Sequence, residues 1–208
     1  MVMAKNRRVL TAYKVFFGLL GLSAIVTEIV VLVARGTFNP VNFFSFFTIQ
    51  TNALVCITFF LSAIFFQKKR ASWLATLRAA TTVYILIVGV GFAVLLSGVE
   101  GLVLSAVPWD NIVLHYIIPV VVLVDFMIDR PVLTTSFVKN TWWLLFPIAY
   151  AAYSLIRGRV SGWYPYPFLN PTIKGYGVVV VSIFGLAILG VLLVWGVSKL
   201  SNKPLRNS

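Results

Sequence analysis

The sequence predicts an all-α, polytopic membrane protein with six transmembrane helices and both termini in the cytoplasm. Three observations predict this class. Hydrophobic residues make up 60% of the 208 residues and charged residues only 11%, against about 45–50% and ~25% in soluble proteins. The apolar residues occur in long blocks, and the cationic residues gather in alternate loops. Residues 1–208 are therefore expected to form a single transmembrane domain.

Six apolar blocks are candidate spans, because a helix needs about 20 residues, with a range of ~17–25, to cross a bilayer. Their approximate limits are 9–34, 41–66, 74–96, 112–127, 141–156 and 175–197. The first block lacks a small-residue cleavage site, so it predicts an uncleaved span and not a signal peptide. The fourth and fifth blocks are short. We expect them to recruit flanking residues such as Trp109 or Asn140, or to lie where the bilayer is thin.

The charges of the loops predict the orientation of the chain. The net charge is +12, and all but four of the 17 cationic residues lie on the side that carries the two termini. The other four are Arg35, Arg157, Arg159 and Lys174. The positive-inside rule then places both termini in the cytoplasm and loops one, three and five outside. This distribution argues against nucleic acid as a partner, and attraction to anionic membrane lipids is a secondary effect.

Few of the usual chemical signatures occur in the sequence. Cys56 is the only cysteine, which excludes an intrachain disulfide or a cysteine metal cluster. One histidine excludes the zinc motifs, and there is no P-loop or GxSxG. We expect no metal and no cofactor.

The single histidine, His115, lies inside an apolar segment that spans residues 110–125. An imidazole in hydrocarbon is costly, so it usually faces a protein interior or a wet cavity and marks function. Counting ~1.5 Å per residue places His115 in the outer half of its span. Pro119, one turn further on, is expected to kink the helix and open space beside the ring.

Other polar residues are predicted at a similar depth in the first and second spans. They are Glu28, Thr48, Gln50, Thr51 and Asn52. A threonine hydroxyl becomes a nucleophile when a neutral imidazole takes its proton, so this set could support nucleophilic catalysis on a hydrophobic substrate. Glu28 could orient the ring, and Asn52 or Gln50 could donate to an oxyanion.

Each of these residues also has a structural interpretation. Glu28 could pair with Arg35, and Gln50 and Asn52 could fasten neighbouring helices. The threonines could bond to their own helix backbone, and His115 could donate to a carbonyl of a neighbouring helix. Nearer the inner face a structural charge cluster is expected, comprising Arg78, Asp125, Asp129 and Arg130.

The loop before the last span is rich in aromatic residues and proline. Its aromatic residues are Trp163, Tyr164, Tyr166 and Phe168. Such side chains are typical of a belt at the membrane interface. The alternative interpretation is a rigid extracytoplasmic cap over a substrate cavity.

Three pieces of sequence carry a resemblance that runs the length of the chain. They are Phe-Phe-Thr-Ile-Gln-Thr-Asn-Ala-Leu-Val (46–55), His115 with Pro119, and Gly-Trp-Tyr-Pro-Tyr-Pro-Phe-Leu (162–169). In this order they resemble the bacterial predicted six-transmembrane protein family. More distantly, they are similar to the androgen-induced / FAR-17a-like membrane proteins.

The resemblance implies an intramembrane threonine hydrolase acting on fatty acid esters of hydroxy fatty acids, located in a bacterial cytoplasmic membrane. Thr48 would be the nucleophile and His115 the general base, with membrane lipids around a hydrophobic ester substrate. Thr51 lies one turn from Thr48 and is the alternative nucleophile. Two other functions stay open: a non-catalytic protein that binds or transports lipids or small molecules, and a structural partner of another membrane protein.

Overall fold

The computed structural model describes residues 2–65, 72–99 and 105–202, and in this part of the chain the only regular secondary structure is helical. The basic residues of the second loop at 68–70, and those after residue 202, lie outside it. The elements in chain order are α1 Val2–Ala34, α2 Pro40–Phe43, α3 Phe47–Ile64, α4 Ser72–Leu95, α5 Pro108–Ile112, the π-helix η2 Val113–Ile117, α6 Ile118–Ile128, α7 Phe137–Asn140, the 3₁₀ helix η3 Thr141–Leu144, α8 Leu145–Ser161, the 3₁₀ helix η4 Pro167–Leu169 and α9 Pro171–Ser201.

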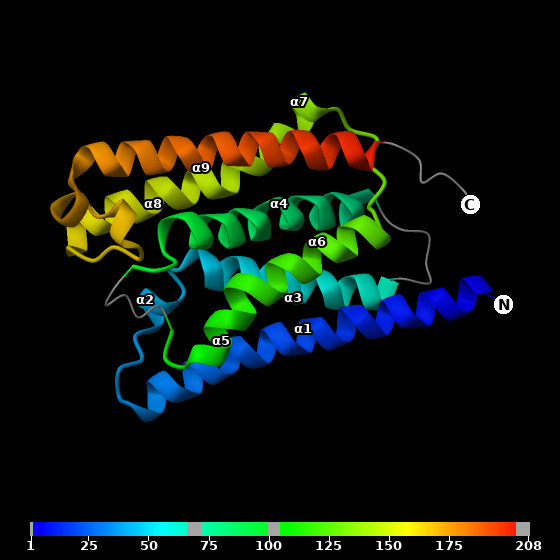
Figure 1. Ribbon diagram of the computed structural model, residues 1–208, viewed down its shortest axis with the longest axis horizontal. Helices are drawn as coiled ribbons and strands as arrows, with labels where there is room; N and C mark the ends of the chain where they lie inside the picture. Colours follow the sequence, from blue (N-terminus) through cyan, green and yellow to red (C-terminus); the bar gives the residue numbers. More distant parts are fainter. Residues whose placement is uncertain (1, 66–71, 100–104, 203–208) are drawn as a thin grey trace.

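The long helices lie side by side along the long axis of the molecule (Figure 1). The beginning of α1 and the end of α9 lie at the same end of this bundle. Helices α2 and α5 and the loop that leads into α9 lie at the opposite end (Figure 1). We call these the terminal end and the loop end.

Five stretches of helix in the described residues are long and apolar enough to cross a membrane. They are Arg7–Ala34, Phe47–Ile64, Ser72–Leu95, Pro108–Ile128 and Pro171–Ser201. An all-helical membrane protein is therefore the class that the structure supports. The fourth stretch includes Trp109, so the prediction that this short block recruits flanking residues is confirmed.

The predicted fifth span, 141–156, takes a different form. Its first residues belong to a 3₁₀ turn, and α8 has 17 residues, or about 25 Å of helix, against ~30 Å of hydrocarbon. Two hydrogen bonds fix this turn to the long helices: Tyr84 Oη donates to the Trp143 carbonyl at 2.7 Å, and Asn140 Nδ2 donates to Ser198 Oγ at 2.9 Å. Helix α8 then runs from this turn to the loop end, within the bundle (Figure 1).

The prediction that the second span is helical from residue 41 is wrong. Asn39 caps the short helix α2, with Pro40 at its first position, and α3 begins only at Phe47. Between the two helices Phe46 is extended, with φ −79° and ψ 126°. The break places Thr48 in the first turn of α3, where the hydropathy pattern had placed it inside a continuous helix.

The kink predicted at Pro119 takes the form of a π-turn. Proline has no N–H, so it cannot donate to the carbonyl four residues earlier, which belongs to His115. The preceding residue, Ile118, instead donates its N–H to the Val113 carbonyl, five residues back. His115 is therefore at the centre of a π-helix, a feature that often occurs at functional sites.

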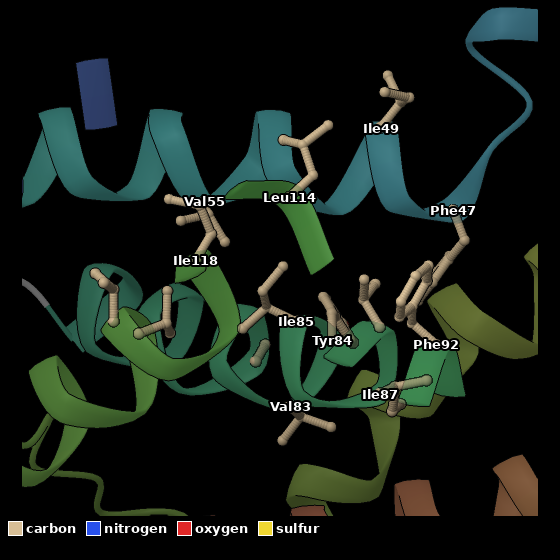
Figure 2. Close-up of a cluster of buried hydrophobic side chains, with 14 of the residues drawn as sticks. Phe47, Ile49, Val55, Val83, Tyr84, Ile85, Ile87, Phe92, Leu114 and Ile118 are labelled. Carbon is tan, nitrogen blue, oxygen red and sulfur yellow. The ribbon is translucent and has the colours of Figure 1, made fainter. Parts of the chain in front are cut away.

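The hydrophobic core holds this fourth span against α3 and α4. Val55 of α3, Ile85 of α4, and Leu114 and Ile118 of the η2–α6 segment are all buried in one cluster. In Figure 2 these side chains converge from the three segments. Their packing sets the relative positions of α3 and the π-turn, and so of the polar residues that these two elements carry.

At the terminal end, four buried charged residues form a balanced network. Lys14 pairs with Asp125 and, at 2.9 Å, with Asp129, while Arg78 pairs with the same carboxylates at 2.8 and 3.1 Å. The predicted cluster thus exists with one correction. Lys14 belongs to it, whereas Arg130 donates to the Leu200 carbonyl.

Candidate active site

Thr48 and His115 lie within hydrogen-bonding distance of one another at the loop end of the bundle. Thr48 Oγ1 is 3.2 Å from His115 Nε2, and both side chains are buried. The two residues are 67 positions apart in the chain and are joined by the packing of α3 against η2. A nucleophile and its base need this separation, about 2.6–3.2 Å.

The other ring nitrogen of His115 defines which tautomer faces Thr48. Its Nδ1 lies 3.1 Å from the carbonyl oxygen of Asn111, which can only accept a hydrogen bond. Nδ1 must therefore carry a proton. In the neutral ring Nε2 is then unprotonated and can accept the hydroxyl proton of Thr48. Phe92 stacks on the imidazole with centroids 4.1 Å apart and holds the plane of the ring.

Tyr166 is the third polar residue of this group. Its hydroxyl lies 3.1 Å from Thr48 Oγ1, and it accepts the backbone N–H of Thr48 at 3.1 Å. With Thr48 donating to His115, the remaining role for the Tyr166 O–H is to donate to Thr48 Oγ1. Burial raises the pKa of Tyr166, so the phenol keeps the proton that it donates.

The first turn of α3 adds a favourable electrostatic environment for negative charge at Thr48. The first N–H groups of a helix have no partner within the helix, and its dipole is positive at this end. Phe46, the N-cap residue, supplies no side-chain bond, and Tyr166 caps Thr48 from another element. The preceding turn is held by Tyr150, which donates to the Ser45 carbonyl at 2.9 Å, and by Tyr153, 2.7 Å from Ser45 Oγ.

Two cavities meet at these three residues, since Thr48, His115 and Tyr166 line both. The larger has a volume of about 230 Å³ and is otherwise walled mainly by apolar side chains of α4, α8 and α9. The smaller, about 130 Å³, has a more polar wall at the loop end. Its other polar residues are Glu28, Thr37, Asn39, Asn42 and Ser105, and its apolar ones are Leu32, Phe43, Phe46, Ile49 and Leu114.

Glu28 lines the smaller cavity, but it does not orient the histidine ring. Both of its carboxylate oxygens accept the N–H of Ala106, at 2.9 and 2.8 Å. The role of ring orienter, predicted for Glu28, belongs to the Asn111 carbonyl. Glu28 thus anchors the segment that leads into α5.

Gln50 and Asn52 were predicted as oxyanion donors, and their amide groups are engaged elsewhere. Gln50 donates to the Phe44 carbonyl at 2.8 Å. Asn52 donates to the carbonyls of Thr48 and Leu114, at 2.9 and 3.2 Å, which fastens α3 to the π-turn. The alternative interpretation, a fastener between spans, is supported for Asn52, whereas Gln50 bonds only to the turn that precedes its own helix.

Thr51 does not approach His115. Its side chain is fully buried, lines neither cavity, and has no hydrogen-bond partner for Oγ1 within the described residues. Of the two threonines one turn apart, the structure brings only Thr48 to the imidazole.

The aromatic loop divides into two parts. Tyr166 and Phe168 stack with centroids 5.2 Å apart and line the larger cavity. Trp163 and Tyr164 pack against the end of α8 instead, with Trp163 beneath the Arg157 guanidinium and Tyr164 filling the space beside Gly158. The second part of the loop therefore forms part of the wall of the larger cavity, whereas the first part does not.

Three groups contribute to the site in ways that the sequence did not predict. The Asn111 carbonyl is backbone, and Phe92 is one of many apolar residues, so neither leaves a signal in the sequence. Tyr166 was identified as a cap residue only, although its position between two prolines, Pro165 and Pro167, indicates a rigid backbone suited to placing one side chain.

Among residues 2–65, 72–99 and 105–202, no group of three histidine, cysteine or acidic side chains is arranged to hold a metal ion.

Comparisons of the chain with protein-family models, with curated proteins and with solved structures found no match.

Proposed function

We propose that the protein is an intramembrane lipid-ester hydrolase in which Thr48 is the nucleophile and His115 the general base. The observation that carries this proposal is the 3.2 Å contact between Thr48 Oγ1 and His115 Nε2 at the junction of the two cavities. The ring tautomer set by Asn111 leaves Nε2 free to accept a proton. A positioned base of this kind contributes about 10²–10⁴-fold to the rate.

The reaction has two halves. In the first, Thr48 Oγ1 attacks the ester carbonyl carbon while His115 Nε2 takes its proton. The oxyanion forms beside the Tyr166 hydroxyl and the positive end of α3, and its collapse expels the alcohol, which receives the proton from His115. In the second, water activated by His115 hydrolyses the acyl-threonine and restores the free hydroxyl.

The substrate of this reaction is a lipid that reaches the site from the membrane. The larger cavity is apolar, as an acyl chain requires, and its wall includes α4 and α9, two helices that are long and apolar enough to cross a membrane. Fatty acid esters of hydroxy fatty acids are the class that the sequence resemblance suggests. We further propose that α8 crosses as a sixth span, with both termini in the cytoplasm of a bacterial cell and the site in the outer half of its inner membrane.

Hydrolysis of a medium-chain acyl ester by the purified protein in detergent tests the proposal. Thr48→Ala and His115→Ala are expected to lower kcat/KM by about 10³-fold or more, because each removes one half of the pair. Thr51→Ala is the matched control: it deletes the same atoms one turn away and is expected to keep activity within about threefold. Thermal melting of each variant checks that it is folded.

Two outcomes would contradict the proposal. Activity that survives Thr48→Ala but disappears in Thr51→Ala would move the nucleophile to Thr51. A wild-type protein that binds a fatty acid without cleaving any ester would favour the non-catalytic lipid-binding or transport function.

A further inference from the structure

The two cavities differ in polarity and in the surface onto which each opens. Ile148 of α8 and Val191 of α9 both line the larger cavity and are 59% and 42% exposed, so this cavity opens between the two helices. On a helix pair in a membrane, that opening faces lipid. Thr37 and Asn39, which line the smaller cavity, are exposed in the connection between α1 and α2, at the loop end. The smaller cavity therefore opens toward water.

The volume of each cavity limits what it can hold. An engineered cavity of ~150 Å³ holds one benzene molecule, so about 230 Å³ accommodates roughly nine carbon atoms of an acyl chain, with a longer chain continuing into lipid. Since one water occupies ~30 Å³, about 130 Å³ corresponds to roughly four waters. The smaller cavity thus suits a group of about the size of glycerol.

The wall of the smaller cavity favours a neutral group with several hydroxyls. Hydroxyl, amide and carboxylate groups come from Thr37, Ser105, Asn39, Asn42 and Glu28. Arg157 lies behind Asn42, donating to its Oδ1 at 2.6 Å, and is not part of the wall. The apolar part of the wall, formed by Leu32, Phe43, Phe46, Ile49 and Leu114, is too small for a long hydrocarbon arm, and a carboxylate at the end of such an arm would find no lining cation.

From these features we infer that the alcohol part of the substrate is a small polyol held in the smaller cavity, so that the preferred substrate is a monoacylglycerol-type ester. This inference rests on the proposed function and refines it. The acyl arm lies in the larger cavity and points to lipid, the ester carbonyl lies at Thr48, and the polyol faces water. Thr37 and Glu28 are then specificity-determining residues for the alcohol, and hydroxy fatty acid esters are poorer substrates.

The test compares three esters of decanoic acid with the purified wild-type protein: 1-monodecanoylglycerol, methyl decanoate and a decanoyl ester of a hydroxy fatty acid. We expect kcat/KM for the glyceryl ester to exceed that for the hydroxy fatty acid ester by about tenfold or more. Thr37→Leu, which places an apolar side chain in the smaller cavity, should lower the ratio of kcat/KM for the glyceryl ester to kcat/KM for the methyl ester by about tenfold. Ala187→Phe, in the wall of the larger cavity, is the matched control and should impair both esters equally.

The outcomes separate this inference from the proposed function. Equal or faster cleavage of the hydroxy fatty acid ester would overturn the inference, as would equal effects of Thr37→Leu on the glyceryl and methyl esters. In both cases, if cleavage of methyl decanoate still depends on Thr48, the proposed hydrolase function is retained and only the inference about the alcohol fails. If the wild-type protein cleaves none of the three esters, the proposed function fails and the inference fails with it.

Discussion

Thr48 is an ordinary membrane threonine by its sequence context and an unusual one by its neighbours. Its hydroxyl contacts an imidazole nitrogen and a phenol, and its N–H is capped by that same phenol. Most threonines in membrane helices bond to their own backbone, as Thr82 does to the Arg78 carbonyl. Because the chain is extended at Phe46, Thr48 lies in the first turn of α3. Its hydroxyl can there bond to side chains of other elements instead of to its own helix.

Removing the Tyr166 hydroxyl tests the role of the third residue in the group. Tyr166→Phe keeps the ring that stacks on Phe168 but deletes the donor to Thr48 Oγ1 and the acceptor of the Thr48 N–H. We expect kcat to fall by about 10²–10³-fold, as for loss of one oxyanion donor, and the free energy of unfolding to fall by only ~1 kcal/mol.

Tyr164→Phe is the control for this change, since Tyr164 lies in the same loop and packs on Gly158 outside both cavities. Steady-state kinetics and thermal melting distinguish the two effects. An unchanged kcat in Tyr166→Phe would show that the hydroxyl only caps α3.

Among the elements, the π-turn of the fourth span determines the direction of His115. The sequence predicted a disturbance at Pro119 but not its form. The His115 carbonyl lacks a donor because Pro119 has no N–H. Whether the helix responds with a kink or with a π-turn depends on the residues that pack beside it. Here α4 approaches so closely that a Cβ on Gly89 would lie 2.9 Å from Pro119 Cβ. Such contacts come from tertiary packing and leave no periodic signal in the chain.

Gly89 therefore offers a test of the π-turn that leaves the side chains of Thr48 and His115 in place, because the added Cβ would meet Pro119 and the His115 carbonyl oxygen. Gly89→Ala is expected to push the π-turn away from α4 and to lower kcat/KM at least about tenfold, because a displacement of ~1 Å can cost 10²-fold. Gly185→Ala on α9 is the control, since a Cβ there meets nothing within 4 Å. Equal activity of the two variants would show that the close approach at Gly89 does not position the histidine.

The beginning of α3 could not be predicted from hydropathy. The run Phe43-Phe44-Ser45-Phe46-Phe47 is as apolar as the helix that follows it, so the sequence predicted one continuous span from residue 41. The turn is stabilised by hydroxyls from far along the chain, Tyr150 and Tyr153. By contrast, the shared depth of Thr48 and His115 followed from span order and helical rise alone, and their proximity in the structure agrees with it.

For the whole molecule, the arrangement of the helices separates a buried charge network from the candidate active site. The Lys14–Arg78–Asp125–Asp129 network lies at the terminal end, and the two cavities lie toward the loop end. Breaking one member of such a buried network typically costs 3–5 kcal/mol. Loss of one of these charges is therefore expected to destabilise the bundle without a direct contact to the candidate active site.

Cysteine accessibility tests the proposed topology, in particular the crossing of α8. In a Cys56→Ala background, single cysteines at Ser136 and Ser161 bracket the η3–α8 segment. An impermeant maleimide added to intact cells should label Ser161→Cys, whereas Ser136→Cys should react only after permeabilisation. Asn202→Cys is a control for the terminal end and should behave like Ser136→Cys. Labelling of both bracketing positions from the same side would show that α8 does not cross.

Identification of the residue that a fluorophosphonate modifies is the sharpest test that Thr48 is the nucleophile. Wild-type protein in detergent, treated with a fluorophosphonate carrying a medium-length alkyl chain, is digested and the modified peptide is sequenced by mass spectrometry. We expect the adduct on Thr48 Oγ1, with labelling lost in Thr48→Ala, strongly slowed in His115→Ala and retained in Thr51→Ala. An adduct on any other residue, or labelling of Thr48→Ala at the wild-type rate, would contradict this assignment.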